Sequence, residues 1–200
     1  MYVTAPNGTP IIGIIGWKKS GKTTLAVRLI EQFTSRGLKV ASVKHAHHQF
    51  RIDDANTDSA RHRIAGASQV AIVSRHRWAI VTELKEKPEP DFMDVIAALQ
   101  SADIIVVEGY KSAPIAKIEA RRLASHTRTP LSDQDPNVIA IAADHEVLSP
   151  GNLPVFSLDD INELADLIDR TIGPLIPRAT AKRKHDVEEE ALAGDDPEVR

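Results

Sequence analysis

The sequence predicts an α/β protein: a mostly parallel sheet with helices on both faces and an extra β-hairpin. Continuous runs rich in isoleucine and valine alternate with amphipathic segments, as in parallel sheets whose two faces are both covered. The first of these runs, PIIGIIG (10–16), leads directly into a glycine- and lysine-rich loop and then into a helical pattern. The 200 residues are 42% hydrophobic, which suits one domain with a substantial core.

Eight segments have the composition of strands. Two of them, QVAIVS (69–74) and WAIVTEL (78–84), are joined by the polar link Arg75-His76-Arg77, and this arrangement predicts the hairpin. The other six, in chain order, are residues 10–16, 38–45, 103–109, 117–122, 137–144 and 154–158.

Four segments have helical spacing. The first (23–37) has an apolar stripe on one face and ends at Gly37, which is the expected C-cap. The second begins at about Asp58, a residue type that favours the N-cap. The remaining helices are expected at 91–101 and 159–173, with N-caps at Asp91 and near Asp159.

The chain divides into one domain (1–176) and a charged tail (177–200) that has almost no large apolar side chains and is predicted to be disordered. Charged residues make up 26% of the chain and the net charge is -3, so neither nucleic acid nor a membrane surface is expected as the main partner. The sequence contains no cysteine, which excludes disulfides, thiolate metal sites and cysteine catalysis. With no signal-like N-terminus and no apolar run near the ~18 residues of a membrane span, we predict a cytoplasmic location.

The segment GWKKSGKT (16–23) has the spacing G-x-x-x-x-G-K-T of a phosphate-binding loop, and it stands between a buried strand and a helix as the fold of P-loop NTPases requires. The two glycines let backbone N–H groups point at phosphate oxygens, and the following helix adds the positive end of its dipole. Lys22 is expected to reach the β- and γ-phosphates, and the Thr23 hydroxyl to bind Mg²⁺. The alternative is a chance glycine turn with solvated surface lysines. The expected nucleotide contacts are Gly16, Trp17, Lys18, Lys19, Ser20, Gly21, Lys22, Thr23 and Thr24.

Two carboxylates are candidates for the metal and the chemistry. Glu108 ends the buried run DIIVVE (103–108), at the edge where open α/β sheets bind ligands; the alternative is a structural glutamate before a turn. Asp53 lies in the polar loop after the second strand and is expected to contact Mg²⁺ directly or through water, as switch segments do. Lys22, Glu108 and Asp53 are therefore the predicted catalytic residues, and Thr23, Glu108 and Asp53 the predicted metal site.

The histidines of KHAHHQF (44–50) raise the alternative of a zinc site. No cysteine and no well-spaced set of acidic ligands accompanies them. A hydrogen-bonding role for His45 in the nucleotide site is favoured instead.

Four blocks in order, GWKKSGKTTL, SVKHAHHQFRID, DSARHRIAGA and DIIVVEGYK, followed by KIEARR, resemble the MobB family, molybdopterin-guanine dinucleotide biosynthesis protein B. The resemblance covers roughly residues 10–170. It implies a homodimeric P-loop protein of the signal-recognition and MinD-like class that binds GTP and Mg²⁺ and has weak GTPase activity. It also implies as partner the guanylyltransferase that joins GMP to molybdopterin, with molybdopterin itself as a further candidate.

Carried over to matching positions, the resemblance assigns the nucleotide loop to residues 16–24 and the acidic strand end to Glu108. Asp53, Arg61 and His62 match blocks that lie near the nucleotide in the family. The N-K-x-D guanine motif is absent from this chain. The nearest candidate is Asp144, which could accept from guanine N1–H and the 2-amino group; the alternative is a helix N-cap.

Three functions compete on the residues alone. The first is GTP binding with slow hydrolysis in support of cofactor guanylation. The second is a small-molecule kinase, since six arginines could hold a phosphoryl acceptor, although no lid or catalytic base is evident. The third is a non-catalytic scaffold that binds nucleotide for stability. The resemblance favours the first. The arginines in question are Arg61, Arg63, Arg75, Arg77, Arg121 and Arg122.

Overall fold

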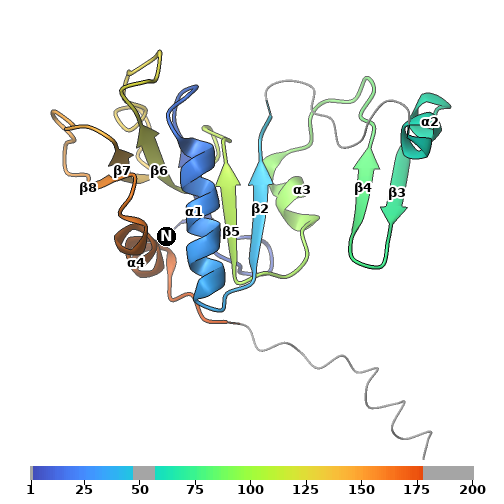
Figure 1. The fold of residues 1–200 in the computed structure, drawn as a ribbon, viewed down its shortest axis with the longest axis horizontal. Helices are drawn as coiled ribbons and strands as arrows, with labels where there is room; N and C mark the ends of the chain where they lie inside the picture. The colour runs from blue at the N-terminus through green and yellow to red at the C-terminus, as the bar shows by residue number, and fades with distance from the viewer. Residues whose placement is uncertain (1, 47–56, 178–200) are drawn as a thin grey trace, which may run out of the picture.

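The computed structural model describes residues 2–46 and 57–177, which form a six-stranded sheet and a separate two-stranded hairpin (Figure 1). The strands of the sheet lie in the order β2-β5-β1-β6-β7-β8, and every neighbouring pair is parallel. The predicted α/β fold with a mostly parallel sheet and an extra hairpin is confirmed. The strands are β1 Ile11–Ile15, β2 Val40–Lys44, β5 Ile104–Glu108, β6 Ala116–Arg121, β7 Val138–Ala143 and β8 Val155–Ser157.

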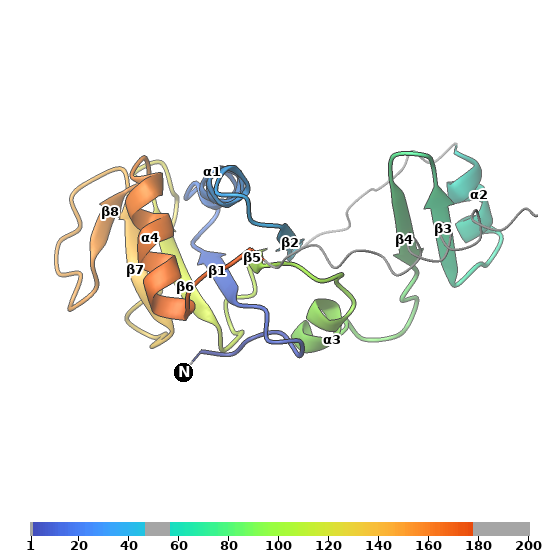
Figure 2. The same ribbon diagram turned by 90° about the horizontal axis from the view of Figure 1, so that it is seen from below.

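Helices cover both faces of this sheet (Figures 1 and 2). On one face, α1 (Lys22–Ser35) and α4 (Ile161–Ile172) pack on the sheet through fully buried side chains such as Phe33 and Leu164. On the other face, Ile96 of the short helix α3 (Phe92–Ala97) joins a second core with β1 and β5. Because both faces are covered, the strands could be built from uninterrupted apolar residues.

Strand β6 differs from its neighbours because it buries two charged side chains. Lys117 is 1% exposed, and its Nζ donates to Asp135 Oδ2 at 2.5 Å. Glu119 is also 1% exposed, and its carboxylate accepts from the backbone N–H groups of Leu131 (2.9 Å) and Ser132 (3.0 Å). Buried charges are tolerated only when they are paired and hydrogen-bonded, as these are. The contacts hold the long loop after β6 against the sheet.

The hairpin stands apart from the sheet. Strands β3 (Gln69–Val73) and β4 (Trp78–Thr82) are antiparallel, and α2 (Asp58–Ile64) packs on β3. Both ribbon views place this unit beyond β2, at the opposite side of the molecule from α4 (Figures 1 and 2). Four large apolar side chains of the hairpin are exposed: Ile72, Val73, Trp78 and Ile80.

Three predicted helix caps are shifted by one residue. Helix α1 has Arg36 rather than Gly37 at its C-cap. The side chain of Thr57, not that of Asp58, accepts from the N–H of Ala60 and caps α2. Helix α4 has Asp160 rather than Asp159 at its N-cap; the Asp160 carboxylate makes no cap hydrogen bond and accepts instead from the N–H of Ser157 at 2.9 Å. These shifts lie within the usual uncertainty of helix ends.

Some predictions fall outside the described residues: Asp53, the second and third histidines of the KHAHHQF segment, and the tail from residue 178 onward. Within residues 2–46 and 57–177, no helix is both long and apolar enough to span a bilayer.

Candidate functional site

The phosphate loop joins the end of β1 to α1 and has backbone angles that suit glycine. Gly16 has φ 149° and Gly21 has φ 89°, and a Cβ on Gly16 would lie 2.5 Å from the carbonyl oxygen of Ala120. Lys19 also has a positive φ, 66°, which is uncommon for a residue with a side chain. Gly21 is the N-cap of α1 and supplies no side-chain cap, and the first turn contains no acidic residue. The first amides of α1 are therefore left for an anionic ligand.

Lys22 spans this loop. Its Nζ donates to the carbonyl oxygen of Trp17 at 2.7 Å, so the ammonium is held over the loop in the absence of a phosphate. Burial lowers the pKa of Lys22, as do the nearby ammonium groups of Lys111 and Lys44, while Glu108 acts in the opposite direction. The three ammonium groups face one carboxylate, Glu108, so the site carries an excess of positive charge that suits a phosphate group.

Glu108 lies next to the loop, as predicted. Its Oε1 accepts from the Thr23 hydroxyl at 2.7 Å, and its Oε2 lies 3.2 Å from Lys44 Nζ. Lys44 also donates to the Thr23 hydroxyl at 3.3 Å. The strand register explains why Lys44 and Glu108 are close: Lys44 of β2 is paired with Glu108 of β5 at the carboxyl edge of the sheet. The structure thus brings together the predicted residues Lys22, Thr23 and Glu108.

These groups suit a Mg²⁺ ion that is held together with a nucleotide. A hydroxyl and a carboxylate are hard oxygen ligands, and Mg²⁺ is usually bound through one or two such groups plus phosphates and water. Among the described residues, no cluster of three His, Asp or Glu side chains could hold a metal alone. Thr23 and Glu108 could therefore hold a metal ion only together with the phosphates of a nucleotide.

His45 lies beside the same strand ends. Its backbone N–H donates to the carbonyl of Glu108 at 2.9 Å, and its Nε2 lies 2.8 Å from Glu89 Oε1. The imidazole stacks on Tyr110 with 4.4 Å between ring centroids. Gly109 has φ 97°, and a Cβ there would lie 3.0 Å from the Cβ of His45. The backbone after Glu108 therefore passes close beneath this histidine, which packs next to the site.

Asp144 lies along the same edge, further from the loop, at the end of β7. No helix follows it, so the predicted alternative of a helix N-cap is wrong; instead Oδ1 accepts from the N–H of Leu123 and contacts His145 Nδ1, both at 2.9 Å. Burial alone would raise the pKa of Asp144, but the hydrogen bonds from His145 and Leu123 outweigh it and the pKa is lowered. Asp144 lines an open pocket beside the ends of β7 and β8.

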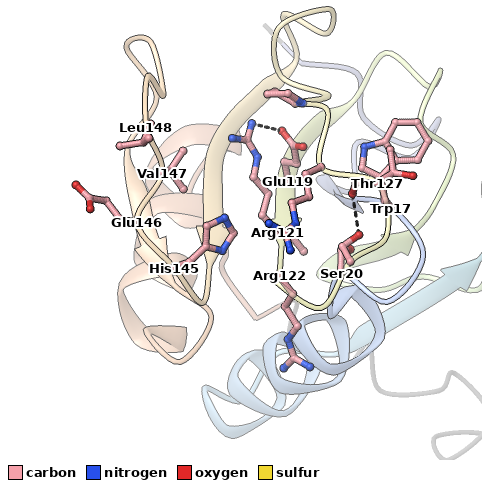
Figure 3. A pocket seen from close by; sticks show the side chains of 14 residues that line it. Trp17, Ser20, Glu119, Arg121, Arg122, Thr127, His145, Glu146, Val147 and Leu148 are labelled. Carbon is pink, nitrogen blue, oxygen red and sulfur yellow. Dashed lines mark hydrogen bonds and ion pairs between the residues drawn. The ribbon is translucent and has the colours of Figure 1, made fainter.

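A second pocket, partly open to solvent, lies beside the loop (Figure 3). Trp17 and Ser20 of the loop form one wall, and the segment from His145 to Leu148 forms the opposite wall. Side chains of β6 and of the loop after it complete the lining.

Two predicted site residues lie far from the carboxyl edge of the sheet in the folded chain. Arg61 and His62 lie on α2 beyond the hairpin, and Arg61 lies 3.6 Å from Asp58 of its own helix. Neither lines the phosphate loop. Asp53 lies outside the described residues.

Three residues near the site were not among the predicted ligands. Lys44 forms the ion pair with Glu108, the Lys111 ammonium lies 3.7 Å from the centre of a Trp17 ring, and the Arg122 guanidinium lies against Gly21. Lys44 could have been found from the sequence, because it lies at the end of the predicted strand 38–45, as Glu108 lies at the end of the predicted strand 103–109. Lys111 and Arg122 could not, since loop packing brings them to the site.

Comparison with known proteins places this geometry in a family. A family model described as "Molybdopterin guanine dinucleotide synthesis protein B", MobB, matches residues 11–144. The chain belongs to the MobB family. The match contains every strand of the sheet except β8, together with the phosphate loop and both carboxylates at the strand ends.

Individual relatives agree with this membership. The "Molybdopterin-guanine dinucleotide biosynthesis adapter protein" of Haemophilus influenzae is 36% identical over 166 residues, covering 82% of this chain and 89% of that protein. The protein of the same name in Escherichia coli is 36% identical over 163 residues, covering 80% and 91%. Thus the similarity extends over most of each relative.

The fold agrees as well. A crystal structure of a molybdopterin-guanine biosynthesis protein B superposes with a TM-score of 0.61 at 25% identity, covering 81% of this chain and 98% of that one. Bacillus subtilis MobB superposes with a TM-score of 0.63 at 24% identity, covering 82% and 98%. The P-loop nucleotide-binding fold predicted from the sequence is confirmed.

Proposed function

We propose that the protein is a GTP-binding adapter of molybdenum cofactor biosynthesis that uses Mg²⁺, hydrolyses GTP slowly and assists the guanylyltransferase that joins GMP to molybdopterin. The role in molybdenum cofactor biosynthesis follows from membership of the MobB family. The nucleotide, the metal and the partner are our inference, and the hydrogen bond between Thr23 and Glu108 at 2.7 Å carries it. With a nucleotide in the loop, Thr23 and Glu108 would hold a Mg²⁺ ion, which would supply positive charge beside the phosphates.

Each residue then has a task. The backbone of residues 16–21 surrounds the phosphates, and the Lys22 ammonium exchanges the Trp17 carbonyl for phosphate oxygens. Thr23 and Glu108 hold the metal, which neutralises charge on the phosphates. Asp144 is the candidate for reading guanine, because its Oδ2 makes no hydrogen bond with a described residue while Oδ1 is anchored.

The proposed homodimer is supported by the hairpin. Its exposed Val73, Trp78 and Ile80 share one face of the two-stranded sheet, and neither strand pairs with a third strand among the described residues. A second copy of the same surface can cover it by two-fold symmetry.

Two assays test the proposal. In the first, purified protein with GTP and Mg²⁺ should release inorganic phosphate slowly without any added acceptor; phosphate transfer to an acceptor would instead indicate a kinase. In the second, addition of the protein to a guanylyltransferase reaction containing GTP and molybdopterin should increase the yield of guanylated cofactor. The Lys22→Ala protein should not increase it, and an increase equal to that of wild type would contradict a nucleotide-dependent adapter.

A further inference from the structure

The loop after β5 carries a lysine, Lys111, that has no part in the proposed nucleotide site. It follows Glu108 by three residues, and its ammonium lies 3.7 Å from the centre of a Trp17 ring. Lys22 and Lys44 are both engaged, the first by the Trp17 carbonyl oxygen and the second by Glu108. The Lys111 ammonium makes no hydrogen bond or ion pair within the described part of the chain. Its donors are therefore available for an anionic ligand.

A buried ion pair holds the backbone of Lys111 in place. Lys117 of β6 is 1% exposed, and its Nζ donates to the Lys111 carbonyl oxygen at 2.9 Å as well as to Asp135 Oδ2 at 2.5 Å. A buried ammonium needs such partners, because an unpaired charge in the interior is costly. These contacts tie the loop after β5 to β6 and to the loop after β6. The position of Lys111 is thus set from inside the protein.

Strand β1 leaves room for the buried lysine. Gly13, in the middle of the apolar run IIGII, is paired with Lys117, and a Cβ at Gly13 would lie 3.1 Å from Lys117 Cγ. A glycine inside a strand weakens it, and its presence often marks the close approach of another group. Here that group is the Lys117 side chain. The glycine of β1 and the buried lysine of β6 therefore form one arrangement with the Lys111 loop.

The strand order places Lys111 at one end of the proposed nucleotide site. Across the sheet, β7 with Asp144 is followed by β6, by β1 with the phosphate loop, and by β5 with Glu108. A nucleotide with its base at Asp144 and its phosphates in the loop would extend towards β5. Its last phosphate would then come closest to Glu108 and to the loop that carries Lys111.

We propose that Lys111 binds the terminal phosphate of a nucleoside triphosphate and that Lys117 is a positioning residue, which holds the Lys111 backbone for this contact. The proposal rests on the proposed function, because it requires a nucleotide in the loop. A phosphate oxygen is a stronger partner for an ammonium than the face of an indole ring, so Lys111 exchanges Trp17 for the phosphate. Besides burial, the charge of Lys111 lowers the pKa of Lys22, and a phosphate bound by both lysines would offset this repulsion.

The ratio of GTP affinity to GDP affinity tests the role of Lys111. Calorimetric titration in Mg²⁺ measures this ratio for wild type, Lys111→Gln and Lys111→Arg, with Lys87→Gln as the control for an exposed lysine. Lys111→Gln should weaken GTP binding about tenfold and change GDP binding less than about twofold, because only GTP has the third phosphate. Lys111→Arg, which keeps the charge, should retain most of the preference for GTP. Equal losses for GTP and GDP, or no loss for either, would overturn the proposal.

Variants of the buried pair test the positioning role. Lys117→Met alone would leave the Asp135 carboxylate unpaired and destabilise the fold, so it is combined with Asp135→Asn. This double variant should lower the preference for GTP, and it should lower it no further in a protein that already carries Lys111→Gln. If the double variant fails to fold in a thermal melt, Gly13→Ala, which crowds the Lys117 side chain, takes its place. A folded variant with the wild-type preference, or an additional loss on top of Lys111→Gln, would show that Lys117 does not act through Lys111.

Failure of the proposed function gives a different result. If wild type binds ATP and not GTP, the role in guanylation is wrong, and the ratio of ATP to ADP affinity tests Lys111 in the same way. If wild type binds no nucleoside triphosphate, both the proposed function and the role of Lys111 are overturned.

Discussion

Replacing Glu108 by glutamine separates metal binding from phosphate binding. Glutamine keeps the size and the oxygen that accepts from Thr23, but it removes the negative charge that faces Lys44 at 3.2 Å. The Lys44 side chain of this ion pair is 60% exposed and the Glu108 side chain 14% exposed, so the substitution should cost about 1–2 kcal/mol of stability, and a thermal melt checks that the variant is folded. Any functional effect then reports on the ligand and not on folding.

The magnitude follows from the charges. Without Mg²⁺, the variant should bind GTP at least as well as wild type, because an anion next to the phosphates has been removed. Mg²⁺ should increase the affinity of wild type for GTP. In the Glu108→Gln protein this increase should be about 10–100-fold smaller, or ~1.4–2.7 kcal/mol, as for other lost metal contacts. Titration of a fluorescent GTP analogue at several Mg²⁺ concentrations measures both, with Glu86→Gln as the control for an exposed glutamate. Unaltered Mg²⁺ dependence would make Glu108 structural and move the metal ligand to Asp53 or Asp54.

Three further predictions concern the base, the dimer and the buried charges. Asp144→Asn should lower GTP affinity by roughly 1–3 kcal/mol and raise the relative affinity for xanthosine triphosphate (XTP), because an amide can donate to the 2-oxo group. If the variant ranks GTP, ATP and XTP as wild type does, Asp144 does not recognise guanine. Trp78→Glu should convert the dimer to a monomer in sedimentation at tens of micromolar, and a wild-type monomer there would refute the hairpin interface. The pKa of Asp135 lies below its usual 3.8: burial would raise it, but the hydrogen bonds from Lys117 and Asn137 prevail. Since the folded-state pKa of Asp135 is depressed, its contribution to stability is complete above about pH 4 and is lost as pH falls further. Asp135→Asn should therefore flatten the decrease of Tm at acid pH. The same decrease of Tm in variant and wild type would contradict the pairing of Asp135 with Lys117.

Most of the fold could be predicted because local pattern and tertiary structure agree. Buried parallel strands need unbroken apolar runs, and all eight runs that were identified form strands. The pairing of Thr23 with Glu108 was also within reach, since both follow buried strands and the carboxyl ends of parallel strands share one edge.

Tertiary placement accounts for what the sequence could not show. The resemblance to MobB placed Arg61 and His62 near the nucleotide. The periodicity of α2 indicates a helix but not its location, and in this structure α2 lies beyond the hairpin. The buried charges of β6 look like a surface strand in the sequence; only the loop that supplies Asp135 and the N–H groups of Leu131 and Ser132 makes their burial possible. The same loop forms part of the pocket beside Trp17, and no local sequence pattern predicts that pocket.

The central claim is that the loop at residues 16–23 binds GTP through Lys22. Equilibrium titration of wild type and Lys22→Ala with a fluorescent GTP analogue in Mg²⁺, with unlabelled GTP and ATP as competitors, tests it most directly. We predict that wild type prefers GTP and that the variant loses about 2–4 kcal/mol of binding free energy, because a charge-assisted contact to the phosphates is removed. Equal affinity in the two proteins would contradict the phosphate-loop assignment, and a preference of wild type for ATP would contradict the role in guanylation.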